Sequence, residues 1–289
     1  MAREPTGKRK ILTITCPDGP GIVAAVSGML TENSSFLTEA AQFGDDDTGR
    51  FFQRIVFEPG PSISESADFG AAFAPVAERF AMDWALHDQG ARLRAIIAVS
   101  KIGHCLNDLL HRHQSGKSAI DVAAVISNHE DMRDLVEWHG IPYHYLPVAP
   151  KCKSAQEEKL CAVIDDAGAE LLVLARYMQV LTAATCERLA GRCINIHHAF
   201  LPGFKGAKPY HRAHERGVKL IGATAHYVTP DLDEGPIIEQ AVERVGHTHT
   251  PEDLIAVGRD IECAVLARAV RWHAERRVLL TGVKTVVFR

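Results

Sequence analysis

The first ninety residues alternate short β-prone apolar runs with stretches of helical spacing. A run of β-branched residues at 10–16 predicts a strand, and the Gly- and Pro-rich turn at 18–21 ends it. Apolar residues then recur three or four apart over 22–30, which predicts a helix. Further strands are expected at 35–43, 50–57 and 82–87, a loop at 59–66 and a second helix at 67–81. This β-α-β-β-α-β order is the ferredoxin-like arrangement.

After about residue 90 the pattern changes to continuous apolar strands separated by amphipathic helices. Strands are predicted at 93–99, 120–126, 142–146, 171–175 and 193–196, and helices at 104–114, 130–139, 154–166, 182–189 and 251–276. Such strands are typical of a mostly parallel sheet covered on both faces. The later runs predict an antiparallel pair at 221–229 and 236–243 and a final hairpin at 278–288. We therefore predict an α/β chain, with a small ferredoxin-like α+β domain at 1–89 and a doubly wound domain at 90–289.

Charge and length agree with two domains and exclude several classes of protein. The 289 residues carry 32 Lys and Arg against 36 Asp and Glu, a net charge of -4 that argues against a dedicated nucleic-acid-binding protein. The excess of acidic residues lies in the N-terminal part, since residues 1–90 hold 7 basic and 13 acidic residues. No signal peptide and no uncharged apolar run of about 18 residues is apparent. We expect a cytoplasmic protein that does not bind membranes.

The cysteines and glycines indicate neither a disulfide framework nor a nucleotide-binding loop. Seven scattered cysteines without a C-x-x-C pair are expected to be reduced thiols. Neither a P-loop nor a G-x-G-x-x-G motif is present. Zinc binding is left as an alternative, although no H-E-x-x-H spacing supports it, for a set of five residues: His197, His198, His211, His214 and Asp233.

The densest polar cluster follows the predicted strand at 193–196. Asn195 and His197 alternate onto one face at the carboxyl end of this strand, where open α/β sheets bind ligands. Asp233 lies in an acidic loop after the strand at 221–229. A carboxylate beside an imidazole would raise the imidazole pKa and fix its tautomer, and an amide could stabilise an oxyanion. The set suits acyl-group chemistry, although a surface His–Asp pair is the commoner outcome for two such residues.

The run from 194 to 240 carries a longer signature, with Asn-x-His, Leu-Pro, His-x-Val and Asp-x-Gly-Pro in order. It resembles the active-site region of the folate-dependent formyl transferase and hydrolase superfamily. That resemblance implies a formyltransferase-type sheet domain in which Asn195, His197 and Asp233 are catalytic. His198 is expected to pack or to hold the loop.

Three further segments, 99–110 (VSKIGHCLNDLL), 125–147 (VISNHEDMRDLVEWHGIPYHYLP) and 174–182 (LARYMQVLT), narrow the resemblance. Within that superfamily the chain is similar over about residues 10–289 to the formyltetrahydrofolate deformylases. The resemblance implies hydrolysis of 10-formyltetrahydrofolate to formate and tetrahydrofolate, which supplies formate for purine synthesis and balances the one-carbon folate pool. The folate is then a substrate, and no cofactor or metal is expected. Related glycinamide ribonucleotide transformylases carry a Gly-x-Gly-Ser-Asn phosphate loop where this chain has 100–105 (SKIGHC), which favours water as the formyl acceptor. A formyl transferase to an amine and a non-catalytic folate or amino-acid sensor are the alternatives.

The same resemblance assigns a substrate pocket. It implies that the pteridine is lined by Met178, Gln179, Val180 and Leu181, and that the loop containing Thr229, Asp231 and Gly235 closes over it. Relatives commonly carry a basic residue at the position of Gln179, which cannot pair with the folate glutamate tail. Arg176 would compensate only if its side chain points the same way. His104 and Lys101 are expected to serve helix entry and solvation.

The N-terminal segment resembles an ACT domain, a small ferredoxin-like regulatory module. That likeness implies an amino-acid effector near Asp18, Gly19, Pro20 and Gly21. It also implies pairing of such domains, so a homo-oligomer of two or more subunits is expected. A role in assembly alone is the other reading of this domain.

Overall fold

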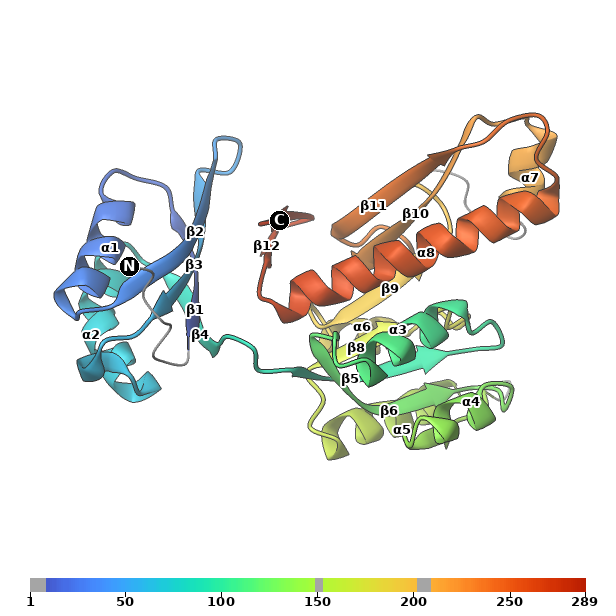
Figure 1. Ribbon diagram of the computed structural model, residues 1–289, viewed down its shortest axis with the longest axis horizontal. Coiled ribbons are helices and arrows are strands. Elements are labelled where there is room, and N and C mark those ends of the chain that lie inside the picture. The colour runs from blue at the N-terminus through green and yellow to red at the C-terminus, as the bar shows by residue number, and fades with distance from the viewer. Residues whose placement is uncertain (1–8, 149–152, 202–208) are drawn as a thin grey trace. The chain divides into compact units, whose positions relative to one another are not determined.

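The computed structural model describes residues 9–148, 153–201 and 209–289, which form two compact units. The first unit comprises the residues up to Ala91 together with Glu275–Leu279 and Val286–Arg289. The second comprises Arg92–Ala274 and Leu280–Thr285 (Figure 1). No helix in the described ranges is both long and apolar enough to cross a bilayer.

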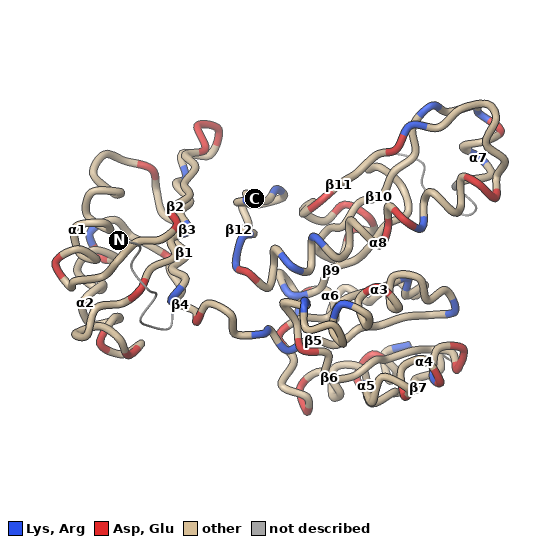
Figure 2. The backbone as a smooth tube through the Cα atoms, viewed as in Figure 1, with Lys and Arg blue, Asp and Glu red and all other residues tan. Residues whose placement is uncertain are grey.

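The first unit is a four-stranded antiparallel sheet covered by two helices. Its elements are β1 (Lys10–Pro17), α1 (Ile22–Glu32), β2 (Phe36–Asp45), β3 (Arg50–Glu58), η1 (Pro61–Ile63), α2 (Ser66–Arg79) and β4 (Asp83–Asp88). The strand order β2-β3-β1-β4 with antiparallel pairing is the arrangement expected from the sequence. The predicted loop at 59–66 differs, because Pro61 starts a short 3-10 helix within it. The turn between β2 and β3 is acidic, with Asp45, Asp46 and Asp47 (Figure 2).

The central strand β3 of this unit is buried on both faces, and C-terminal residues of the chain help to cover one of them. On the helical face, Phe69 and Phe73 of α2 pack against Trp84 of β4. On the other face, Phe52 packs with Leu279 and Phe288 from the end of the chain. The predicted domain at 1–89 therefore leaves out the C-terminal residues that cover one face of its sheet.

The second unit is a seven-stranded α/β sheet. Its strands are β5 (Leu93–Val99), β6 (Ile120–Ser127), β7 (Tyr143–Tyr145), β8 (Leu171–Leu174), β9 (Cys193–His197), β10 (Leu220–Tyr227) and β11 (Ile237–Arg244). They follow the order β11-β10-β9-β8-β5-β6-β7, and the neighbouring pairs from β9 to β7 are parallel. β10 and β11 continue the sheet in antiparallel fashion. This is the mostly parallel sheet that the sequence predicts.

Both faces of this sheet are covered, since the consecutive residues 95–99 of β5, whose side chains point alternately to the two faces, are all buried. Residues of α5 and α6 pack with Ile96 and Ala98 in one core cluster. The helices are α3 (His104–Gln114), α4 (Arg133–Trp138), α5 (Lys153–Asp166), α6 (Ala183–Arg188), α7 (Pro209–Glu215) and α8 (Pro251–Ala274). The sequence analysis did not predict α7. The long α8 runs along β9, β10 and β11, and the chain ends in the hairpin of β12 (Val278–Thr281) and β13 (Lys284–Val287).

Candidate active site

A cavity of about 500 Å³ lies at the carboxyl ends of β8 and β9, and the segment that follows β10 also lines it. Its walls come from three segments, at 176–181 after β8, at 195–198 at the end of β9, and at 228–233 after β10. Parallel β8 and β9 present their carboxyl ends at the same edge of the sheet, which is the usual ligand position in open α/β sheets. The fold thus brings together the segments that the sequence analysis singled out.

The three residues predicted to be catalytic, Asn195, His197 and Asp233, all line this cavity. Nδ1 of His197 lies 3.1 Å from Oδ1 of Asp233. The Asn195 amide lies alongside, with Nδ2 3.4 Å from Nε2 of His226. Because β9 and β10 are paired in register, Asn195 faces His226 across the sheet. An imidazole, a carboxylate and an amide therefore line one cavity, the combination that acyl-group chemistry uses.

The loop after β10 reaches the site through a tight turn. Gly235 is buried, and a Cβ at this position would lie 1.7 Å from the carbonyl oxygen of Tyr227. The turn is closed by a 2.9 Å hydrogen bond from the Tyr227 amide to the Pro236 carbonyl. Asp233 has a φ of 59°, a left-handed conformation that non-glycine residues seldom adopt and that clusters at functional sites. This strained turn aims the carboxylate at His197.

Burial changes the expected charge of the site histidines. It lowers the pKa of His197, and the neighbouring Asp233 carboxylate opposes this only in part. The Asp233 carboxylate does raise this pKa, as the sequence led us to expect, but desolvation of the 93% buried ring is the larger effect and the net shift is downward. The resting imidazole is neutral near pH 7. Its Nδ1–H donates to Asp233, which leaves a lone pair on Nε2.

His226 is a site residue that the sequence analysis did not assign. Its Nδ1 lies 2.8 Å from the carbonyl oxygen of Tyr227, which can only accept, so Nδ1 carries the proton. Nε2 is then an acceptor for the Asn195 amide and fixes which way that amide points. Burial lowers the pKa of His226 and keeps the ring neutral. The sequence offered one signal for it: side chains alternate between the two faces of a strand, so His226 lies on the same face of β10 as the polar residue Thr224.

A buried charged cluster lies behind the histidines. Glu262 of α8 is 1% exposed, and its two oxygens lie 2.8 Å from Nε2 of His104 and 2.9 Å from the Tyr210 hydroxyl. Arg176 lies 3.5 Å from the same carboxylate and 2.7 Å from Nδ1 of His198. Burial raises the pKa of Glu262, but the His104 hydrogen bond and the Arg176 charge outweigh it and lower the pKa overall. Glu262 is therefore ionised.

This cluster changes two expectations from the sequence. The Arg176 side chain is 13% exposed and is engaged by Glu262 and His198, so it is not directed at a folate tail in place of Gln179. His104 does more than begin a helix, because it holds the buried carboxylate of Glu262. Lys101 is exposed, as expected.

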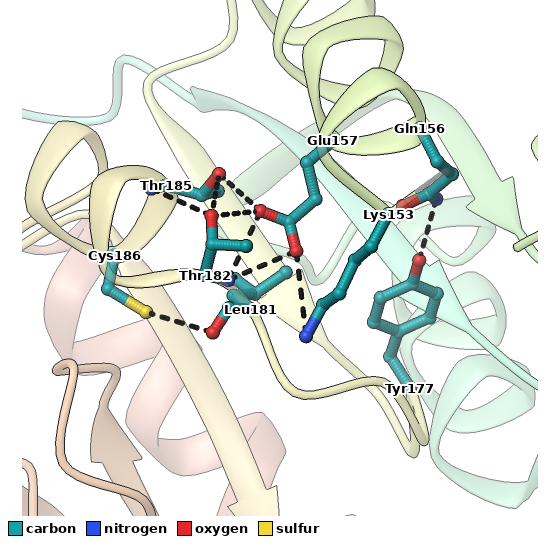
Figure 3. Close-up of polar contacts among 8 residues, drawn as sticks. All are labelled: Lys153, Gln156, Glu157, Tyr177, Leu181, Thr182, Thr185 and Cys186. Carbon is teal, nitrogen blue, oxygen red and sulfur yellow. Dashed lines mark hydrogen bonds and ion pairs between the residues drawn. The ribbon is translucent and has the colours of Figure 1, made fainter. Parts of the chain in front are cut away.

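The wall at 176–181 is anchored at both ends by buried hydrogen bonds. The Met178 amide donates to Oγ of Ser100 at 2.9 Å. Next to it, Gln156 donates to the Tyr177 hydroxyl at 2.9 Å. At the other end, buried Glu157 accepts a 3.0 Å hydrogen bond from the Thr182 amide, where α6 begins (Figure 3). The main chain between these anchors is held in place from both sides.

The remaining predicted substrate residues fall around the same cavity. Met178 and Val180 are 60% and 53% exposed, an unusual degree for apolar residues, and Leu181 is buried. Gln179, Thr229 and Asp231 also line the cavity, and Gly235 shapes the turn below it. The segment 202–208 of the signature lies outside the described residues.

Among the described residues, only one group has three possible metal ligands close together. These are His104, Cys105 and Cys263, whose ligand atoms lie within 4.8 Å of one another. The hydrogen bond that the Cys105 thiol donates to Cys263, together with burial, raises the pKa of Cys105, whereas a metal requires the thiolate. The zinc set considered from the sequence is not such a group among the described residues.

The predicted effector loop caps the first helix of the N-terminal unit. The Asp18 amide donates to Gly49 at 2.8 Å, and its carboxylate accepts from the Gly19 amide at 2.8 Å. Gly21, with a φ of 90°, is the N-cap residue of α1. An open cavity of about 560 Å³ borders Gly19, Gly21 and the first turns of α1. Pro20, between these glycines, is exposed.

Comparison with known proteins places these features in a family. The formyl transferase family model matches residues 93–270. The chain is 52% identical to a formyltetrahydrofolate deformylase of Corynebacterium sp. (strain P-1), over 97% of this chain and 98% of that protein. The crystal structure of formyltetrahydrofolate deformylase from Burkholderia mallei matches with a TM-score of 0.93 and 52% identity, covering 98% of this chain and 100% of that one. Glycinamide ribonucleotide transformylase 1 from Symbiobacterium toebii matches with a TM-score of 0.66 and 30% identity, over 71% of this chain and 98% of that chain.

Proposed function

Because this chain belongs to the formyl transferase family, and within it to the formyltetrahydrofolate deformylases, we propose that it hydrolyses 10-formyltetrahydrofolate to formate and tetrahydrofolate. The observation that carries the proposal is the 3.1 Å contact of His197 with Asp233 in a cavity that Asn195 also lines. The similarity extends over both units, since it covers 97% of the chain.

The proposed reaction begins with neutral His197. Asp233 holds the Nδ1–H, so Nε2 can accept a proton from a water as its oxygen attacks the formyl carbon. The carbonyl π electrons move to the formyl oxygen, and the Asn195 amide and the newly formed imidazolium stabilise this oxyanion. Collapse of the tetrahedral intermediate breaks the bond to N10, which takes the proton from His197. The products are formate and tetrahydrofolate.

The proposed pteridine site is the wall at 176–181 together with the loop at 228–233. Main-chain groups between the anchors at Met178 and Thr182 would pair with the heterocycle, while exposed Met178 and Val180 would cover its faces. Gln179 offers no positive charge, and Arg176 is engaged elsewhere. We therefore expect polyglutamate tails to add little affinity.

The decisive experiment is incubation of the purified protein with 10-formyltetrahydrofolate and water alone. We expect equal amounts of formate and tetrahydrofolate, at a rate that dialysis against a chelator does not change. A rate that depends on an added amine would instead identify a transferase. Absence of turnover with retained folate binding would identify a sensor.

We further propose that the N-terminal unit is an ACT domain that binds an amino acid and assembles the enzyme in the cytoplasm. Its strand order β2-β3-β1-β4 and the cavity beside Gly19 and Gly21 support this reading. Phe36 and Phe43 of the edge strand β2 are 48% and 47% exposed, which suits pairing with another copy. Titration of amino acids during the assay and sedimentation of the full chain test the two parts separately.

A further inference from the structure

We propose that His198 is a second hydrogen-bond partner of the attacking water, beside His197. Arg176 and Glu262 are positioning residues that keep the His198 proton on Nε2. The proposal rests on the hydrolytic function proposed above. It assigns a role in the reaction to a residue that the sequence analysis expected only to pack or to hold the loop.

The two imidazole rings are held as a matched pair. Their centroids lie 4.8 Å apart with 18° between the ring planes, and both rings line the cavity. The two Nδ1 atoms have partners of opposite charge. Nδ1 of His197 faces the carboxylate of Asp233, and Nδ1 of His198 lies 2.7 Å from the guanidinium of Arg176.

These partners fix opposite tautomers. A carboxylate only accepts hydrogen bonds, so His197 carries its proton on Nδ1 and a lone pair on Nε2. A guanidinium only donates, so His198 accepts at Nδ1 and carries its proton on Nε2. One ring therefore presents an acceptor and the other a donor.

Both Nε2 atoms are buried and have no hydrogen-bond partner among the described residues. Buried polar groups in proteins are nearly always paired, so these two atoms need a partner. A water can donate to His197 and accept from His198 at once. A formyl oxygen accepts only and would leave the His197 lone pair unused, which is why the pair fits the nucleophile.

The charged cluster behind His198 keeps its ring in the tautomer that carries the proton on Nε2. Glu262 is fixed by His104 and Tyr210, and it holds Arg176 against the ring. Gly258 makes room for this arrangement, because a Cβ there would lie 2.1 Å from the Tyr210 hydroxyl. Burial and the Arg176 charge lower the pKa of His198 to about 4, so the ring stays neutral and does not compete with His197 for the proton.

The test compares two substitutions of His198 in the full-length enzyme. In His198→Gln the longer side chain brings its amide N–H near the Nε2 position, whereas in His198→Asn the amide lies near Nδ1 and no donor replaces Nε2–H. We expect His198→Asn to lower kcat by about tenfold or more, the effect of one lost hydrogen bond, with KM unchanged. His198→Gln should recover most of that loss, and both variants should unfold at similar temperatures.

A second measurement reads the tautomer directly. Nitrogen-15 NMR of histidine-labelled protein should show one ring, absent from His198→Gln, that is neutral and protonated on Nε2. In Arg176→Met this ring should lose its single tautomer, and kcat should fall while KM holds.

Three results would overturn the proposal: a His198→Asn enzyme as fast as the wild type, a His198→Gln enzyme no better than His198→Asn, or an Nδ1–H tautomer at His198. Wild-type formate release is measured first. Its absence would refute the proposed hydrolase function, and its presence with any of these results would refute only the role of His198.

Discussion

Nδ1 of His197 lies 3.1 Å from Oδ1 of Asp233, although one residue ends a buried strand and the other occupies a strained turn. The strand position fixes the imidazole by register with β10. The carboxylate reaches it only because Asp233 adopts a left-handed φ of 59°. A backbone conformation of this kind costs on the order of 1–3 kcal/mol, which the surrounding structure must offset.

Replacing Asp233 by Asn is expected to lower kcat for formate release by about 100-fold or more, a loss of the size seen when one polar group of an active site is removed. The amide is nearly isosteric, but it can donate to Nδ1 and would favour the tautomer with the proton on Nε2, where the reaction needs a lone pair. Steady-state kinetics measure the effect. Asp166→Asn, which alters an exposed carboxylate on α5, is the matched control and should match the wild type.

Asn195→Ala should also lower kcat by about 100- to 1000-fold, since it removes an oxyanion donor. KM should change little, because the amide acts on charge that develops after binding. His226→Phe keeps an aromatic ring but removes the acceptor that orients the amide, so a smaller loss of kcat is expected. Similar KM values for the wild type and both variants, with kcat lowest in Asn195→Ala and intermediate in His226→Phe, would agree with these roles. A His226→Phe enzyme with unchanged kcat would show that Asn195 needs no such orientation.

Most of the fold followed from periodicity, and the site followed from an ordered motif. Both sheets were expected because apolar runs of strand length alternate with helical spacing, and β5 at Leu93–Val99 and α3 at His104–Gln114 match their predicted ranges. Asn195, His197 and Asp233, which the signature at 194–240 singles out, line one cavity, and His197 and Asp233 are in contact there. Long, strongly periodic segments and motif residues at strand ends are the features that local sequence determines.

What the sequence did not predict depends on contacts between distant segments. Phe288 packs against Phe52, more than 200 residues earlier in the chain, and no local sequence pattern indicates this contact. Glu262 lies on the long helix α8 among apolar residues, where its partners His104 and Arg176 cannot be identified from spacing. The sign of the His197 pKa shift also required burial to be known, because burial and the Asp233 charge oppose each other.

Stability should fall as the pH drops from about 6.5 toward about 4, because burial and the Arg176 charge lower the pKa of His198 to about 4 in the folded protein. The unfolded chain binds a proton at this residue near its ordinary pKa of about 6.5, so it takes up the proton before the folded protein does. The contribution is present above about 6.5 and is lost as the pH falls to the folded pKa. It amounts to roughly 3 kcal/mol.

Urea unfolding across this range measures the slope, and His198→Gln, which cannot titrate, should be flatter than the wild type. The groups that bear on this ring are Arg176, His197, Glu262 and Asp233. Burial lowers the pKa values of His197 and His226 as well, so part of the slope should persist in the variant. If the unfolding free energy changed with pH equally in the two proteins, His198 would not be a buried neutral ring in the folded protein.

The turn that carries Asp233 should tolerate no side chain at Gly235. In Gly235→Ala the new Cβ would lie 1.7 Å from the Tyr227 carbonyl oxygen, a backbone atom that cannot move without breaking the 2.9 Å bond from the Tyr227 amide to Pro236. We expect a lower unfolding temperature and a loss of formate release, because the carboxylate would no longer reach His197. Gly28→Ala is the matched substitution, since Gly28 lies inside α1 with nothing within 4 Å of a new Cβ. It should raise the unfolding free energy by about 0.5–1 kcal/mol through helix propensity and leave kcat unchanged. A Gly235→Ala enzyme with wild-type stability and rate would show that the close approach of this turn is not required to place Asp233.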